Sequence, residues 1–220
     1  MKSLHSLAVV LVLLGLAPGA RAGLYYSGET FAELPSQWRG FLLDHRALRG
    51  IAVQAKGMAP SPLRVEYQEA ATKLEKKARD GKLTADELAD LGALYVRLGE
   101  TTRAIELLRG AQREHPNHFR IVSNLGTAWQ LQADLEQAAL CLQQAVQLAP
   151  GKLQKAEELQ LKLVRLRQRQ AKDAQDLDDL FGLKYVDDNG KFAAGKLGAE
   201  QRKKLPSNAA ALVQQLCLWL

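Results

Sequence analysis

The chain has 220 residues, of which 47% are hydrophobic and 25% charged, and this suits one globular or repeat domain with extensions. Its net charge of +6 is too mild to argue for a nucleic-acid partner. Aromatic residues make up only 6%, whereas Ala, Leu, Gln, Glu, Lys and Arg, which lose little side-chain freedom in a helix, are abundant. An all-α fold is therefore expected.

Residues 1–22 have the order of a secretory signal peptide. A positive start precedes the apolar run Leu7–Leu16, and small residues at Ala20 and Ala22 follow. This pattern predicts cleavage before Gly23 and a periplasmic or secreted protein. The apolar run is too short to span a bilayer, which takes about 20 residues. A retained amino-terminal anchor is the alternative.

The region from residue 23 to 60 is predicted to contain one short helix. It extends from Ser36 to Arg49, with Ser36 as the N-cap and Gly50 as the residue that ends it. The stretch GMAPSP, residues 57–62, has the composition of a turn or linker.

The middle of the chain contains an internal repeat. Residues 85–118 and 119–152 align without a gap over a period of 34 residues. The matched pairs are Leu91/Leu125, Gly92/Gly126, Tyr95/Trp129, Ala104/Ala138, Leu108/Leu142, Ala111/Ala145 and Pro116/Pro150. Each copy has the pattern of two helices that pair and leave an apolar face for a neighbouring repeat to cover.

Small residues and prolines explain how each helical pair is built. Gly92 and Gly126 lack a Cβ, so the partner helix can approach closely there. Gly99 is expected to form the turn between the paired helices. The stretch LGALYVRLGE, which contains Gly92 and Gly99, has no Lys-Ser/Thr after it and no preceding strand, so a phosphate-binding loop is not supported.

In its small-residue, aromatic and proline positions, this repeat resembles the tetratricopeptide repeat family. The family's usual Trp at the fourth position is replaced by Leu88 and Val122. The resemblance implies a helical solenoid whose concave face binds a protein or peptide. It places the groove on the first helix of each repeat, at Asp86, Ala89, Ala93, Val96, Arg97, Arg120, Ser123, Thr127, Gln130 and Leu131. The paired Lys and Asn with which some members grip a terminal carboxylate are not at those positions.

Partial repeats are predicted on both sides of the two copies. Residues 61–84 place Ala70 and Leu74 one period before Ala104 and Leu108, as in the second helix of a degenerate leading repeat. Residues 153–176 continue the leucine stripe, and we expect one long capping helix from Lys152 to about Asp176.

The remaining residues, 177–220, are interpreted as a carboxyl-terminal extension. Asn189-Gly190 is a favoured hairpin turn pair, and an apolar helix is expected after an N-cap at Ser207 or Asn208. That helix has almost no polar face, which is typical of a contact surface. Three alternatives remain open: it packs back onto the repeats, it joins an assembly, or the chain is a truncated form of a longer repeat protein.

No pattern of residues indicates catalysis, a metal or another cofactor. His115 and His118 form a single pair in a loop, whereas structural zinc sites normally have four ligands. No nucleophile stands in a recognisable activation motif. Export permits a disulfide between Cys141 and Cys217, although both lie in apolar helical contexts where Cys often acts as a small hydrophobe.

The sequence thus predicts an exported scaffold that binds a protein or peptide through the concave face of its repeats and is not an enzyme. The alternative is an accessory subunit of an envelope enzyme or assembly complex, docked through the apolar carboxyl-terminal helix. The partner and the oligomeric state are left open.

Overall fold

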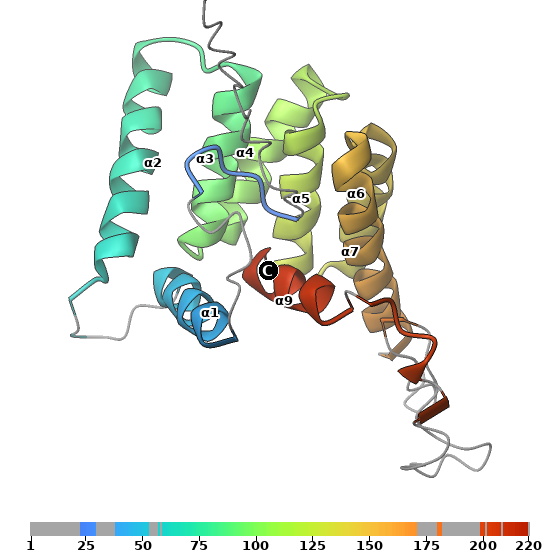
Figure 1. Ribbon diagram of the computed structural model, residues 1–220. Coiled ribbons are helices and arrows are strands. Elements are labelled where there is room, and N and C mark those ends of the chain that lie inside the picture. Colours follow the sequence, from blue (N-terminus) through green and yellow to red (C-terminus); the bar gives the residue numbers. More distant parts are fainter. Residues whose placement is uncertain are drawn as a thin grey trace, which may run out of the picture.

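The fold is known from a computed structural model that describes residues 23–29, 38–52, 57, 59–170, 180–181, 199–200, 202–207 and 209–219. Every regular element within these ranges is helical, so the all-α expectation is confirmed for the described part of the chain. The helices are α1 (Trp38–Ala52), α2 (Pro62–Asp80), α3 (Ala85–Arg97), α4 (Thr101–Glu114), α5 (Phe119–Leu131), α6 (Leu135–Leu148), α7 (Gly151–Gln170) and α9 (Ala209–Trp219). In Figure 1, α2 to α7 stand side by side, and α1 and α9 lie together at one end of the row.

The 34-residue period of the sequence reappears in the helix boundaries. Each end of α5 lies 34 residues after the matching end of α3, and the same holds for α6 and α4. Helix α2 ends at Asp80, one period before the end of α4. Consecutive helices from α2 to α7 pack on one another, and α3 also packs on α5. The arrangement is a row of helical hairpins.

Side-chain caps fix where these helices begin. The Ser61 hydroxyl accepts a hydrogen bond at the start of α2, where Pro62 occupies the first turn. Thr84 and Glu87 form a reciprocal capping box at the start of α3. The side chains of His118 and Asp134 cap α5 and α6 in the same way. Local chemistry therefore specifies most of the helix starts.

The close helix approach expected at the repeated glycines is confirmed. A Cβ built on Gly92 would lie 2.5 Å from the Leu108 side chain of the paired helix. One built on Gly126 would lie 2.8 Å from Leu142. Both leucines are fully buried, so neither has free space into which it could retreat.

The turn between paired helices uses a left-handed backbone. Gly99 has φ +82° between α3 and α4, and Ala133 has φ +66° at the matching place between α5 and α6. Gly99 therefore makes the turn that the sequence predicts. In the second repeat an alanine adopts a conformation that favours glycine.

The buried side chains form two clusters. The larger cluster joins residues of α1 to α6, Ala156 of α7 and Leu216 of α9. The smaller cluster consists of Ala138 and Leu142 from α6 with Leu161 and Val164 from α7. The amino-terminal segment contributes Leu24 to the larger cluster, which fixes its position against the helices.

One predicted boundary is wrong. Gly50 does not end α1, which continues to Ala52. The next residue, Ile51, is fully buried in the core, and a glycine at position 50 has no atom within 4 Å of where its Cβ would be. Burial of Ile51 extends the helix past a residue that is only mildly unfavourable in it. The proposed cap Ser36 lies outside the described residues.

The carboxyl-terminal half of the chain is only partly described. Helix α7 begins at Gly151 and is described to Gln170, so the rest of the expected capping helix lies outside the described residues, as does the Asn189-Gly190 turn. Helix α9 packs against α1 and buries Leu216, as one of the three alternatives for it supposes. Both cysteines are free, Cys141 buried and Cys217 exposed. None of the described helices combines the length and apolar character that crossing a membrane requires.

Candidate functional site

The segment of residues 23–29, here called the N-segment, crosses the first helices of the two repeats. Figure 1 shows it in blue, in front of α3 and α5. It has no regular secondary structure, and Gly23, Leu24, Tyr25 and Glu29 are buried within it. The face on which the sequence places a peptide groove is therefore covered by residues of the same chain.

Asn124 of α5 holds the backbone of the N-segment with both halves of its side-chain amide. Its Oδ1 accepts a hydrogen bond from the N–H of Tyr25 at 2.6 Å, and its Nδ2 donates to the Tyr25 carbonyl at 3.0 Å. The same Nδ2 donates to the carbonyl of Ala89 in α3, also at 3.0 Å. Since Asn124 is fully buried, these bonds are shielded from water and depend on no side chain of the bound segment.

Asp90 does in the first repeat what Asn124 does in the second. It lies 34 residues before Asn124 on the matching helix, and its Oδ1 accepts from the backbone N–H of Ser27 at 2.9 Å. Its other oxygen accepts from the Ser27 hydroxyl at 2.5 Å. One repeat position thus binds alternate residues of the N-segment, which matches the two-residue alternation of an extended chain.

A cationic side chain closes this part of the site. Arg120 donates to the Tyr25 carbonyl at 3.3 Å and pairs with Asp90 and, at 3.1 Å, with Asp86. Asp86 also lies 3.2 Å from His118, the cap of α5, and remains 68% exposed. The two repeats are therefore joined by a charged network at the edge of the N-segment.

A buried carboxylate lies at the start of the N-segment. Glu157 of α7 is fully buried and accepts hydrogen bonds from the Gly23 N–H at 3.2 Å and the Tyr25 hydroxyl at 2.7 Å. The Ser123 hydroxyl reaches both of its oxygens, at 3.1 and 3.0 Å. Burial raises the pKa of Glu157, although these hydrogen bonds oppose the shift. The Thr127 hydroxyl completes the contact by donating to the Gly23 carbonyl.

A buried ion pair holds the other end of the N-segment. The guanidinium of Arg97 donates to Glu29 from Nε at 3.1 Å and from a terminal nitrogen at 3.0 Å. The Tyr67 hydroxyl donates to the second oxygen of Glu29 at 2.6 Å. Both charged side chains are less than a tenth exposed, so the carboxylate is fully enclosed by donors.

The predicted groove residues are distributed over this site as follows. Arg97, Arg120 and Thr127 contact the N-segment directly. Ser123 acts through Glu157, and Gln130 accepts from Gln160 of α7 at 3.1 Å. The others do not touch the N-segment through a polar side chain: Asp86 pairs with Arg120, Ala89 offers its carbonyl to Asn124, Ala93 is buried, and Val96 and Leu131 line a cavity.

Sequence reasoning missed Asn124, Asp90, Glu157 and Gln160, as well as the N-segment itself. A signal for two of them was present, because Asp90 and Asn124 are polar residues one period apart on otherwise apolar helix faces. Glu157 and Gln160 follow Leu153 on the capping helix, where the repeat pattern weakens and offers no matching pair. The N-segment has no periodic pattern at all.

An apolar cavity of about 620 Å³ lies between the N-segment, α1 and α9. Its walls include Leu24, Val96, Leu131 and Leu216, with His45 and Arg97 as polar groups. It therefore joins the end of the concave face to the contact between α1 and α9.

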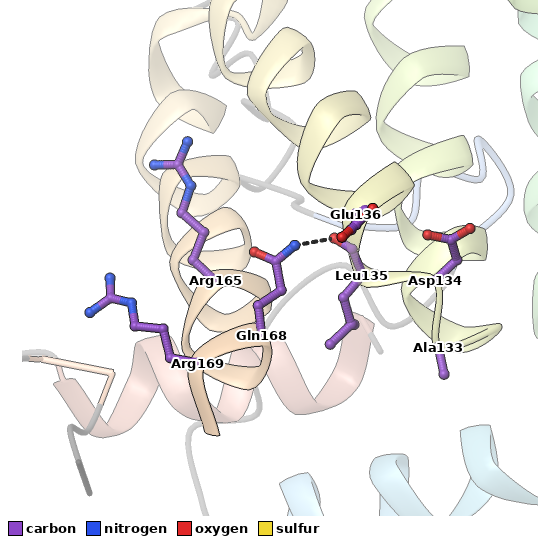
Figure 2. Close-up of a pocket in the computed structure, with 7 residues that line it drawn as sticks. All are labelled: Ala133, Asp134, Leu135, Glu136, Arg165, Gln168 and Arg169. Atoms are coloured by element: carbon purple, nitrogen blue, oxygen red, sulfur yellow. Dashed lines mark hydrogen bonds between the residues drawn. The ribbon is translucent and has the colours of Figure 1, made fainter. Parts of the chain in front are cut away.

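A second recess, of about 730 Å³, lies between the α5–α6 turn and α7. Figure 2 shows the guanidinium groups of Arg165 and Arg169 on the α7 side and the carboxylates of Asp134 and Glu136 on the other. Between them Gln168 donates to the Leu135 carbonyl at 2.9 Å. None of the residues that line this recess is a Ser, Cys, His or Lys that could act as a nucleophile or base.

The described residues contain no group of three or more His, Cys, Asp or Glu side chains that could hold a metal ion. His118 accepts the Ile121 N–H at 3.4 Å as a helix cap, which accounts for that histidine structurally. Comparison with protein-family models, with curated proteins and with solved structures finds no significant match.

Proposed function

We propose that this chain is an exported scaffold of the tetratricopeptide repeat type, whose concave face binds an extended peptide by its backbone. The observation that carries the proposal is the pair Asp90 and Asn124, one repeat apart, which hydrogen-bond the backbone of Ser27 and Tyr25. Backbone recognition of an extended segment supplies affinity, whereas pockets for alternate side chains supply specificity.

The side chains of the N-segment indicate which peptides would fit. The Tyr25 ring packs edge-on against Phe119, with centroids 4.8 Å apart, and Tyr26 lies 5.5 Å from Tyr67. Glu29 is enclosed by Arg97 and Tyr67. The favoured partner is therefore an extended segment with an aromatic residue and, four residues later, a carboxylate. The N-segment occupies the face in cis, so a partner in trans has to displace it.

Export to the periplasm or beyond is part of the same proposal. Its support is the order of charge, apolar run and small residues in 1–22, which lie outside the described residues. No catalytic role and no cofactor is assigned, because the observed polar groups of the concave face are used in holding the N-segment.

The experiment measures binding of a synthetic peptide with the sequence of residues 23–29, labelled at its carboxyl end, by fluorescence anisotropy. The receptor is the full chain carrying Tyr25→Ala, which weakens the N-segment in cis. The peptide is expected to bind this variant more tightly than the unmodified chain. Adding Asn124→Ala should then weaken binding about tenfold or more, because two hydrogen bonds of about 1 kcal/mol each are lost.

Asn117→Ala is the matched control, since Asn117 is an exposed residue of the loop between α4 and α5. It should leave the affinity unchanged. Equal affinity with and without Asn124, in variants that remain folded by circular dichroism, would sink the groove assignment.

The alternative of an accessory subunit docked through the carboxyl-terminal helix has less support. Leu216 of α9 is buried against the rest of the chain, and Val213 is the large apolar residue of that helix that is most exposed among those described, at 40%. A single half-exposed valine is a small surface on which to base a stable interface.

A further inference from the structure

The carboxylate of Glu157 is buried without a cationic partner among the described residues. Its hydrogen bonds come from the Gly23 N–H and from the hydroxyls of Tyr25 and Ser123, all of which are neutral donors. A fully buried carboxylate is costly unless a positive charge lies beside it. This site therefore has the chemistry of a receptor for a cation.

A second buried acceptor belongs to the same hydrogen-bonded group. Gln160 uses its Nε2 to donate to Thr127 at 2.9 Å and to Gln130 at 3.1 Å, whereas its Oε1 has no partner among the described residues. Thr127 in turn donates to the Gly23 carbonyl, so it cannot also donate to Gln160. The residues that hold Gly23 thus have more acceptors than the single N–H of Gly23 can satisfy.

Gly23 is the residue that the predicted cleavage would make the first of the mature chain. Hydrolysis by a signal peptidase adds the hydroxyl of water to the carbonyl carbon of Ala22 and a hydrogen to the nitrogen of Gly23. The amine so released takes up a proton at neutral pH, since the ordinary pKa of an α-amino group is about 7.7–8.0. One neutral N–H is thereby replaced by three donors that carry a positive charge.

We propose that Glu157 and Gln160 form a binding site for the α-ammonium group of Gly23 that is generated when the leader is removed. The nitrogen is already 3.2 Å from Glu157, so the ion pair needs no rearrangement of the site. Processing then fastens the N-segment across α3 and α5. The proposal rests on the export step of the proposed function but not on the binding of any partner peptide.

The test compares thermal unfolding of two chains that begin at Gly23, one with a free amino terminus and one acetylated on it. Acetylation keeps one N–H for Glu157 and removes only the charge and the extra donors. The acetylated chain is expected to melt about 5–15 °C lower, because a buried carboxylate loses its counter-ion. In Glu157→Gln the two forms should melt within about 2 °C of each other. Glu158→Gln, which changes an exposed neighbour, should keep the full difference.

Equal melting temperatures for the free and acetylated chains would overturn the proposal. Nuclear magnetic resonance of the ¹⁵N-labelled Gly23 amine gives a second measurement that does not depend on how well Glu157→Gln folds. The amine pKa is expected above its ordinary range, and an ordinary value would equally overturn the assignment. Neither readout involves a peptide in trans, so failure here is distinguishable from failure of the peptide-binding proposal.

Discussion

Asn124 binds both the N–H and the carbonyl of Tyr25, although 99 residues separate the two in the chain. The same side chain also holds the Ala89 carbonyl, so it joins α5, α3 and the N-segment at one buried point. Removing it would leave three backbone groups short of a partner, of which only the Tyr25 carbonyl keeps another donor, Arg120.

Asn124→Ala is therefore expected to destabilise the protein by about 2–4 kcal/mol, since each unsatisfied buried polar group costs about 1–3 kcal/mol. Urea unfolding followed by circular dichroism measures the change. Asn117→Ala in the exposed loop should stay within about 0.5 kcal/mol of the unmodified chain. A loss at Asn124 no larger than that at Asn117 would mean that the N-segment contributes little to stability.

Glycine-to-alanine substitutions in three helices should differ in sign. Gly92→Ala and Gly126→Ala place a methyl group against the buried Leu108 and Leu142, and each should cost about 1–3 kcal/mol through overpacking. Gly110→Ala in α4 meets no atom within 4 Å and should gain about 0.5–1 kcal/mol from helix propensity. Melting temperatures of the three variants decide the matter. Stabilisation by Gly92→Ala would show that the paired helices are not in close contact there.

The two hairpin turns predict another pair of opposite effects. Gly99→Ala forces a side chain into the left-handed region and to 2.8 Å from the Ala52 carbonyl, at a cost of about 2 kcal/mol or more. Ala133→Gly relieves the same backbone conformation in the second repeat and should gain up to about 1 kcal/mol. Denaturant midpoints check both. If Ala133→Gly proves destabilising, relief of backbone strain is not the dominant effect at that turn.

Stability of the full chain with the leader retained should depend on the protonation of Glu157. Burial raises the pKa of this carboxyl, so the folded state binds its proton more tightly than the unfolded state does. Its contribution to stability is therefore full below the ordinary pKa of about 4.3 and is lost as the pH rises through the raised value. Tyr25, the titratable side chain that contacts it, has a pKa raised well above its usual range, and the Ser123 contact from α5 is neutral.

The measurement compares urea midpoints at pH 4.5 and pH 7 for the full chain and for Glu157→Gln. The midpoint is expected to fall between these pH values by more in the unmodified chain than in the variant. Glu158→Gln, at an exposed position, should behave like the unmodified chain. An identical pH dependence in Glu157→Gln would assign the fall to other groups.

Much of the helical framework could be predicted from the sequence, because its causes are local or periodic. Thr84 with Glu87 and Ser61 with Pro62 mark helix starts within a single turn of chain. Gly92 and Gly126 indicate close approach because one period separates them. The boundary at Gly50 failed for the opposite reason, since burial of the neighbouring Ile51 is decided by the packing of α1 on the core.

The sequence by itself determined an all-helical chain of 34-residue hairpins and the helix face on which contacts were to be sought. Only the tertiary structure showed that residues 23–29 cover that face and that Asn124, Asp90 and Glu157 hold them. The physical reason is the distance along the chain. Helix periodicity and caps depend on residues a few positions apart, whereas the hydrogen bond between Gly23 and Glu157 joins groups 134 residues apart, and no local pattern encodes it.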